Sequence, residues 1–104
     1  MADFLPLQVT VMSDGAGPIV AVRGEIDLAS SPELWMRLSP LLGDFRVILD
    51  LGGVTYMDSS GIRVLETAHC RSIACGGTLV IQSVPPIIRR VLEITGCDKI
   101  LNVE

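Results

Sequence analysis

Two adjacent hydroxyls lie between a carboxylate and a glycine in the segment Asp58-Ser59-Ser60-Gly61. Asp and Ser are preferred at the start of a helix, because their side-chain oxygens accept hydrogen bonds from the free backbone amides there. Helix capping is therefore one interpretation of the segment. The other is a modification site, because the free amides and partial positive charge of a helix start accommodate a phosphoryl group on a serine without unfolding the helix.

A hydrolytic serine would need a general base within hydrogen-bond reach, and the chain has one histidine, His69. On a helix that begins near residue 58, His69 lies about 13 Å along the axis and about 180° around from Ser60, so the two side chains cannot touch. The segment also lacks the G-x-S-x-G pattern of hydrolase nucleophiles. An esterase that uses Ser60 is the least favoured function, and we expect His69 to be a hydrogen-bonded histidine on the apolar side of the helix.

Three aspartates, Asp27, Asp50 and Asp58, fall near the ends of predicted strands, where oxygen ligands for a divalent cation could share one rim of a sheet. Solvated aspartates are nevertheless ordinary at strand-to-helix connections. In addition, no glycine-rich phosphate loop precedes the only lysine, Lys99. We therefore expect no metal site.

The three cysteines are odd in number and form no C-x-x-C pair. They are Cys70, Cys75 and Cys97. This pattern indicates free thiols in a reducing compartment rather than a disulfide framework or a zinc site.

The composition of the 104 residues predicts one domain, residues 1–104, with an aliphatic core, because hydrophobic residues make up 49% and aromatic residues only 4%. A net charge of -4 offers no basic surface for nucleic acid. No apolar stretch approaches the roughly 20 residues that span a membrane. Because Met1–Phe4 also lacks the positive region of a signal peptide, we expect a cytoplasmic protein.

Hydrophobic periodicity and turn residues predict the elements that position these side chains. Strands are expected at residues 7–11, 19–22, 46–51, 78–82 and, at an edge, 100–103. The alternating pattern of residues 7–11 indicates a strand at or near the edge of the sheet, in a hairpin with the second strand. The continuous apolar run 46–51 indicates the centre of the sheet, and residues 52–57 are interpreted as a loop.

Three helices are predicted between the strands. Ser30 and Glu33 predict a capping box ahead of the first helix, and Pro40 should kink or end that helix. The second begins at Asp58 and stops at Gly76-Gly77, with a predicted buried side of Ile62, Leu65, His69 and Ile73. The third covers residues 83–95, and its apolar residues are more than one buried stripe needs: Ile87, Ile88, Val91, Leu92 and Ile94. We expect burial under the C-terminal residues; the alternative is that some stay exposed and form a candidate contact surface.

This order of elements predicts an α/β fold. We expect a mixed sheet of four to five strands that opens with a β-hairpin and is packed with three main helices. A response-regulator receiver would instead alternate strand and helix from its first element, so the opening hairpin argues against that fold.

Four segments together resemble the STAS domain of the anti-sigma factor antagonist family. They are Val22–Asp27 (VRGEID), Val47–Leu51 (VILDL), Tyr56–Leu65 (YMDSSGIRVL) and Pro85–Gly96 (PPIIRRVLEITG). Their order and spacing cover nearly the whole chain, and the third is typical of members that are phosphorylated. The resemblance implies a single STAS domain.

By this resemblance the chain is an anti-sigma factor antagonist and not an enzyme. Ser60, with Ser59 as the alternative, would be phosphorylated by a partner that is both an anti-sigma factor and a serine kinase of the GHKL ATPase type. The unphosphorylated chain would bind that kinase and so release a sigma factor, and a PP2C-type phosphatase would reset the phosphorylated form. ATP and Mg²⁺ would belong to the kinase, so this chain would hold no cofactor.

The resemblance also implies a contact surface around the serine. Asp27, in the loop that enters the first helix, would help to shape it, and the whole surface comprises Asp27, Asp58, Ser59, Ser60, Gly61 and Arg63. Other STAS domains are binding modules that are never phosphorylated, in sensory complexes or as cytoplasmic parts of transport systems. That function remains the alternative.

Overall fold

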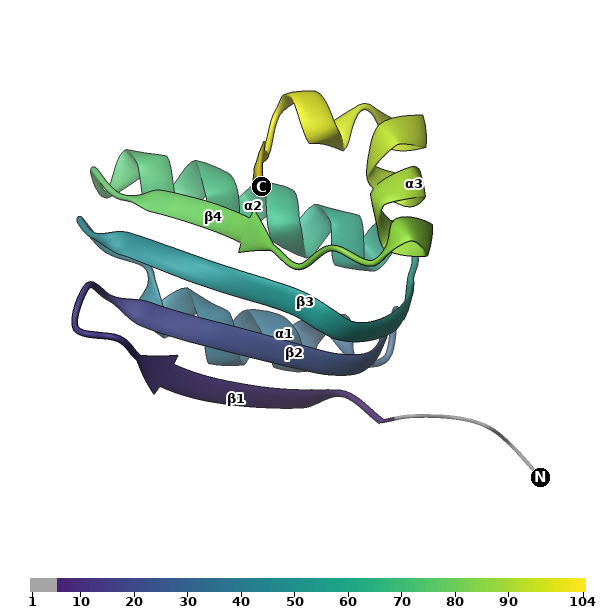
Figure 1. The fold of residues 1–104 in the computed structure, drawn as a ribbon, viewed down its shortest axis with the longest axis horizontal. Coiled ribbons are helices and arrows are strands. Elements are labelled where there is room, and N and C mark those ends of the chain that lie inside the picture. Colours follow the sequence, from purple (N-terminus) through teal and green to yellow (C-terminus); the bar gives the residue numbers. More distant parts are fainter. Residues whose placement is uncertain (1–5) are drawn as a thin grey trace.

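Five strands form one mixed sheet in the order β1-β2-β3-β4-β5 (Figure 1). They are β1 (Gln8–Ser13), β2 (Pro18–Ile26), β3 (Arg46–Met57), β4 (Thr78–Gln82) and β5 (Asn102–Val103). β1 pairs with β2 antiparallel and the other three pairings are parallel, so the predicted α/β fold with an opening hairpin is confirmed. The computed structural model describes residues 6–104, and the prediction made from Met1–Phe4 lies outside the described residues.

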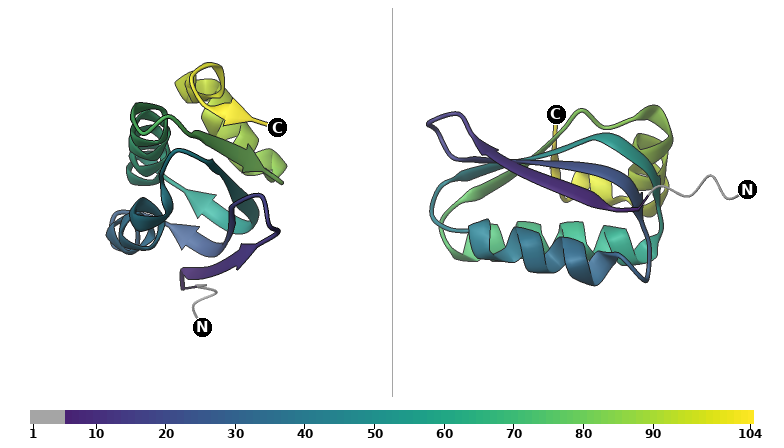
Figure 2. Two further views of the ribbon diagram at one scale, coloured as in Figure 1. Left: turned by 90° about the vertical axis from the view of Figure 1, so that its left-hand side faces the viewer. Right: turned by 90° about the horizontal axis from the view of Figure 1, so that it is seen from below.

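Helices connect the strands. They are α1 (Ser31–Leu38), the 3-10 helix η1 (Ser39–Leu41), α2 (Ser59–Ala74), α3 (Pro86–Thr95) and the 3-10 helix η2 (Cys97–Lys99). α1 and α2 lie side by side over one face of the sheet, whereas α3 lies at the end where β4 stops (Figure 1, Figure 2). Within residues 6–104, no helix has the length and apolar character needed to cross a membrane.

The core is aliphatic, as the composition predicts; it includes buried residues of the sheet, of α1 and α2, and of α3, where Ile88 and Leu92 are buried. Its fully buried side chains include Val20, Leu34, Leu49, Leu65 and Ile81. Each such side chain contributes about 1.5–3 kcal/mol through its removal from water. Residues 47–49 of β3 are all buried, as expected of a strand at the sheet centre, and β1 is exposed along most of its length, which confirms its edge position.

The prediction of a loop at residues 52–57 is wrong, because β3 continues to Met57. β2 is also longer than predicted and pairs with this extension in parallel, from Arg23 opposite Gly53 to Ile26 opposite Met57. Glycine at position 53 leaves room for the neighbouring side chain, since a Cβ there would lie 2.5 Å from Arg23 Cγ. The two strands therefore remain paired up to the start of the candidate site.

The longer β3 changes where the three aspartates lie. Asp50 lies inside the strand, between Ala21 of β2 and Gln82 of β4, whereas Asp27 and Asp58 directly follow β2 and β3. The three aspartates therefore do not share one rim of the sheet, an arrangement that the sequence left open. In the described part of the chain, no group of three or more His, Cys, Asp or Glu is placed to hold a metal ion. The cysteines are free thiols, as predicted: Cys70 and Cys75 are exposed and Cys97 is buried.

α1 is short because Pro40 has no amide to continue the helical ladder. The helix ends at Leu38 and η1 follows, which confirms the predicted early end. At its start, however, the predicted capping box is not formed, because the Ser30 side chain makes no capping bond to the helix. The Ser30 hydroxyl oxygen accepts instead the amide of Asp27 at 2.9 Å, and the hydroxyl lies 2.9 Å from both Glu25 O and Asp27 Oδ1 as its acceptors.

The buried stripe of α2 is rotated from the predicted one. The residues that face the core are Gly61, Ile62, Val64, Leu65, Ala68 and Ser72. Ile73, predicted to be buried, is 59% exposed, and half-buried His69 has a buried Nδ1 without a hydrogen-bond partner, so both expectations are wrong. The prediction followed the large apolar residues, whereas much of the helix face against the sheet consists of Gly, Ala and Ser.

α3 begins at Pro86, three residues later than predicted, because Ser83 adopts a left-handed φ of 59° that a helix cannot continue. Only one side of the helix is buried. Ile87 and Ile94 are 64% and 73% exposed, so the favoured burial under the C-terminal residues is wrong for these two, and the alternative of a partly exposed apolar surface holds. The C-terminal strand β5 pairs with β4 at the sheet edge and does not cover the outer side of α3.

Candidate functional site

Asp58 caps α2 and holds the hydroxyl of Ser60. Its backbone is extended, and its Oδ1 accepts hydrogen bonds from the Ser60 amide, at 2.9 Å, and from the Ser60 hydroxyl. The predicted capping role is confirmed. Ser59, the first residue of the helix, is exposed, whereas Ser60 is half-buried. The two candidate serines therefore differ in exposure and in their relation to the capping carboxylate.

The Asp58 carboxyl is held in its ionised form. The hydrogen bond from the Ser60 hydroxyl lowers the pKa of Asp58 most; partial burial raises that pKa by less, and the amides of Ser60, Gly61 and Leu28 lower it further. A carboxylate with a lowered pKa is a weak base. Asp58 therefore orients the hydroxyl rather than removing its proton.

We expect this ionisation to stabilise the fold above about pH 4. Because the folded-state pKa of Asp58 is below the unfolded one, the contribution is fully present above the unfolded pKa and is lost as pH falls through the folded pKa. Asp58→Asn keeps a capping oxygen but cannot ionise, so its free energy of unfolding should fall less than the wild-type value between pH 7 and pH 3. Urea denaturation at both pH values measures this, with Asp44→Asn, an exposed aspartate before β3, as the charge-matched control. Equal pH dependence of wild type and Asp58→Asn would contradict it.

Asp27 lies next to this cap. The Asp58 amide donates to the carbonyl of Ile26, the last residue of β2, at 3.2 Å, so the residues that follow the two strands are held together. Asp27 Oδ1 accepts the amides of Ala29 and Ser30 at 3.1 and 3.0 Å. The carboxylate thus shapes the loop that enters α1, beside the start of α2.

Gly61 allows α2 to approach the end of the sheet closely. A Cβ at this position would lie 2.6 Å from Met57 Cγ and 2.8 Å from Ile26 Cγ2. Alanine normally stabilises a helix by about 1 kcal/mol relative to glycine. Here we expect Gly61→Ala to lower the free energy of unfolding by about 1–3 kcal/mol, because the methyl group overpacks the site. Urea denaturation gives the sign, and exposed Ser59→Ala is the control in the same helical turn; a stabilised Gly61→Ala would show that α2 shifts freely.

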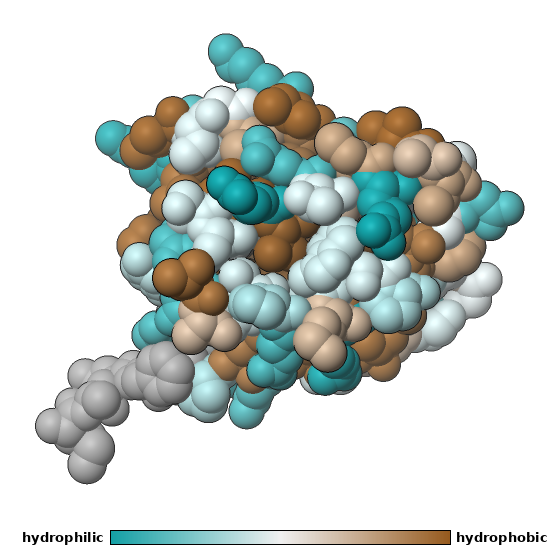
Figure 3. Space-filling view, turned by 180° about the vertical axis from the view of Figure 1, so that it is seen from behind, coloured by the Kyte–Doolittle hydropathy of each residue, from teal (hydrophilic) through white to brown (hydrophobic). Residues whose placement is uncertain are grey.

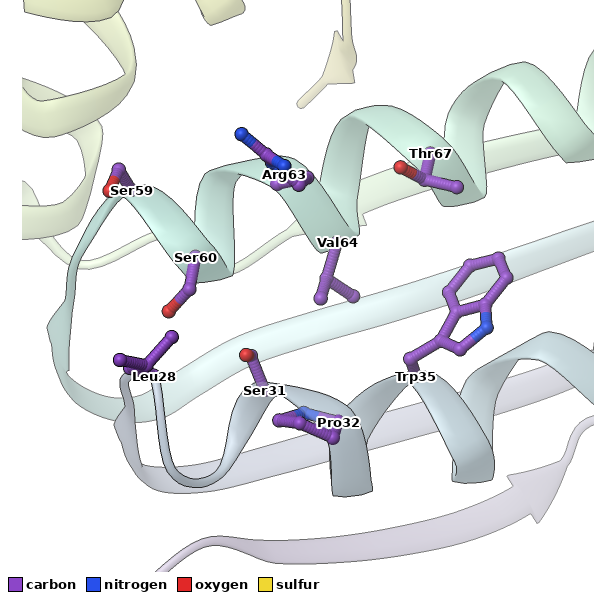
Figure 4. Close-up of a pocket in the computed structure, with 9 residues that line it drawn as sticks. All are labelled: Leu28, Ser31, Pro32, Trp35, Ser59, Ser60, Arg63, Val64 and Thr67. Carbon is purple, nitrogen blue, oxygen red and sulfur yellow. The ribbon is translucent and has the colours of Figure 1, made fainter.

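A groove of about 510 Å³ lies between α1 and α2, with Ser60 at one end (Figure 4). Its α2 side comprises Ser59, Ser60, Arg63, Val64 and Thr67, and its α1 side comprises Leu28, Ser31, Pro32 and Trp35. The Ser60 hydroxyl points toward the start of α1, whereas Trp35 and Thr67 lie farther along the groove. Figure 3 shows this face of the molecule hollowed near its centre, over apolar atoms.

The structure brings most of the predicted site residues together. Asp58, Ser59, Ser60 and Gly61 form the start of α2, Asp27 lies in the adjoining loop, and Arg63 follows within one turn. His69 and Asp50 do not line the groove. The α1 side of the groove was not predicted, and its one sequence signal was the single tryptophan, Trp35, next to the apolar stripe of the first helix.

Comparison with known proteins gives consistent matches. The family model described as "Mlab, STAS domain" matches residues 9–102. The anti-sigma-B factor antagonist of Bacillus subtilis (strain 168) is 33% identical over 87 residues, which is 81% of this chain and 78% of that protein. The crystal structure of an anti-sigma factor antagonist from Mycobacterium paratuberculosis has a TM-score of 0.79 and 25% identity, over 93% of this chain and 84% of that one. The phosphorylated form of SpoIIAA, a Bacillus cell fate determinant, shares the fold with a TM-score of 0.69 and 16% identity, over 93% of this chain and 91% of that one.

Proposed function

Because the chain belongs to the STAS domain family of anti-sigma factor antagonists, we propose that it binds and antagonises an anti-sigma factor. In the proposed cycle, the unphosphorylated chain binds an anti-sigma factor that is also a GHKL-type serine kinase, and a sigma factor is released. The kinase phosphorylates Ser60 with its own ATP and Mg²⁺, and a PP2C-type phosphatase restores the binding form. The chain is a substrate and a switch, and it acts in the cytoplasm, where sigma factors act.

The position of the Ser60 hydroxyl supports this proposal more than any other observation. It lies in the first turn of α2, where free amides and the helix dipole favour an added phosphoryl group. It also lines an open groove that a partner can reach, and Asp58 fixes its orientation. The same fold is known in a phosphorylated form in SpoIIAA. Ser59, which is exposed beside it, is the alternative acceptor.

A single phosphate is sufficient for such a switch. A loss of about a hundredfold in affinity needs about 2.7 kcal/mol. One pair of like charges about 5 Å apart, at an effective dielectric constant of about 20, supplies about 3 kcal/mol before salt screening. We therefore expect local repulsion and steric exclusion at the start of α2, with little change of fold.

The proposal is tested with the purified cognate anti-sigma factor. Incubation with ATP and Mg²⁺ should raise the intact mass of this chain by one phosphate. Gel filtration should show a complex with the unmodified chain that the modified chain does not form. Binding without any increase in mass would instead indicate an unphosphorylated binding module of a sensory or transport complex, and no binding in either form would contradict the proposal.

A further inference from the structure

The groove between α1 and α2 has a wall that phosphorylation of Ser60 does not explain. On the α1 side this wall consists of Leu28, Pro32 and Trp35 with the buried Ser31. Of these residues, Leu28 is 80% exposed. Apolar side chains gathered at the surface around a hollow are typical of sites that bind another protein.

The α2 wall of the groove carries positive charge, although the chain as a whole has a net charge of -4 and the ionised Asp58 carboxylate holds the Ser60 hydroxyl at one end of the groove. Arg63 is the one charged residue among the nine that line it. Arg71, two turns farther along α2, lies with its guanidinium 5.1 Å from the centre of the Trp35 ring. Glu66 of α2 faces elsewhere, because its carboxylate accepts the thiol of Cys97 at 3.3 Å. The groove therefore offers positive charge beside apolar walls.

We propose that this groove binds an acidic segment of the anti-sigma factor, with one apolar side chain of the segment inserted between Leu28, Trp35 and Val64. The inference rests on the proposed function and adds the feature by which the partner is recognised. Charge complementarity favours an acidic segment, because Arg63 and Arg71 both lie along α2. The groove volume of about 510 Å³ lies within the range of about 300–1,000 Å³ that is typical of ligand-binding pockets, so the groove has room for a side chain of the partner.

Modification of Ser60 acts directly on this contact, because Ser60 lies at the end of the same groove. Ser60 and Arg63 are three residues apart on α2, a spacing that makes them neighbours on the helix surface. A phosphate on Ser60 repels an acidic segment and also attracts Arg63 away from it. The positive charge of Arg63, which binds the acidic segment, thus also makes release of the partner sensitive to phosphorylation of Ser60.

Two matched pairs of variants test the groove by isothermal titration calorimetry with the unphosphorylated chain and its anti-sigma factor. Leu28→Ala should weaken binding about tenfold or more, because an apolar contact is lost. Ile94→Ala, at a similarly exposed position of α3, should change it less than about twofold. Arg63→Glu should weaken binding about tenfold or more at low salt, and Arg90→Glu, the same charge change on α3, less than about threefold. Arg63→Lys should restore most of the affinity.

Trp35 reports occupation of the groove directly, because it is the only tryptophan of the chain. Incorporation of fluorotryptophan gives one fluorine resonance from a groove wall. That resonance should shift when the anti-sigma factor is added to the unphosphorylated chain. It should stay unchanged when the anti-sigma factor is added to the chain phosphorylated at Ser60.

The outcomes separate this inference from the function on which it rests. Groove variants that bind as tightly as wild type would overturn the inference and leave the proposed function standing. Losses confined to Ile94→Ala and Arg90→Glu would overturn it by assigning the contact to α3. A fluorine shift that depends only on the concentration of this chain would overturn it by placing a second copy in the groove. If the wild-type chain neither binds an anti-sigma factor nor accepts phosphate, the proposed function itself fails.

Discussion

Ser60→Ala is expected to abolish phosphorylation and to leave the chain permanently able to bind its anti-sigma factor. Alanine removes the acceptor oxygen and the side-chain bond to Asp58, while the bond from the residue 60 amide to the Asp58 carboxylate remains available. The helix start is therefore preserved. Intact mass and affinity, measured before and after incubation with kinase, ATP and Mg²⁺, should both stay unchanged.

Ser59→Ala is the matched control for this experiment, because it removes the neighbouring hydroxyl from an exposed position. It should accept one phosphate as the wild-type chain does. Phosphorylation of Ser60→Ala to full stoichiometry, with loss of phosphorylation in Ser59→Ala, would move the modified residue to Ser59.

Phosphorylation of the wild-type chain is expected to weaken the complex about a hundredfold or more at low salt. Phosphate adds about -1.5 to -2 charges, whereas Ser60→Asp adds about -1, so the variant should weaken binding by a smaller factor. Because the repulsion is partly screened, raising the ionic strength should recover part of the affinity. Titration calorimetry at low and high salt measures both effects.

The far-ultraviolet circular dichroism spectrum is the control for this second prediction, because the proposed mechanism leaves the fold in place. The phosphorylated and unphosphorylated chains should give the same spectrum. An affinity that phosphate does not alter would exclude the switch, and a large spectral change would replace local repulsion with a conformational mechanism.

The order and type of the elements could be predicted from the sequence because the informative patterns are local. Alternation at residues 7–11 marks an edge strand, and the apolar run 46–51 marks the central one. Pro40 and Gly96 end their helices through backbone chemistry of their own, the first by lacking an amide and the second by a left-handed φ of 77°. These features need no distant partner.

The errors in the predicted fold arise where the structure depends on contacts between residues that are far apart in sequence. The second half of β3 is a strand because the end of β2 pairs with it, which the composition of residues 52–57 does not show. The buried face of α2 includes Gly61, Ala68 and Ser72, because small side chains fit where the helix approaches its neighbours closely. A pattern that counts only large apolar residues selects Ile73 instead.

The candidate site likewise has one part that could be predicted from the sequence and another that could not. The cap at Asp58 could be predicted, because its hydrogen bonds reach only two residues along the chain. The capping box at Ser30 could not be excluded from sequence, because the amide that donates to the Ser30 hydroxyl oxygen in place of a helix amide belongs to Asp27, in a loop whose path depends on the sheet. The groove could not be predicted at all, since it depends on how α1 and α2 lie against each other.

The hydrogen bond from the Asp58 amide to the Ile26 carbonyl ties the start of α2 to the last residue of β2. The backbone around Ser60 is thereby held by the sheet on one side and by the helix on the other. Under the proposed function, the response of the molecule is as fast as phosphoryl transfer itself, without a delay for refolding. The response is also fully reversible, because after hydrolysis of the phosphoester the chain has the same conformation as before phosphorylation.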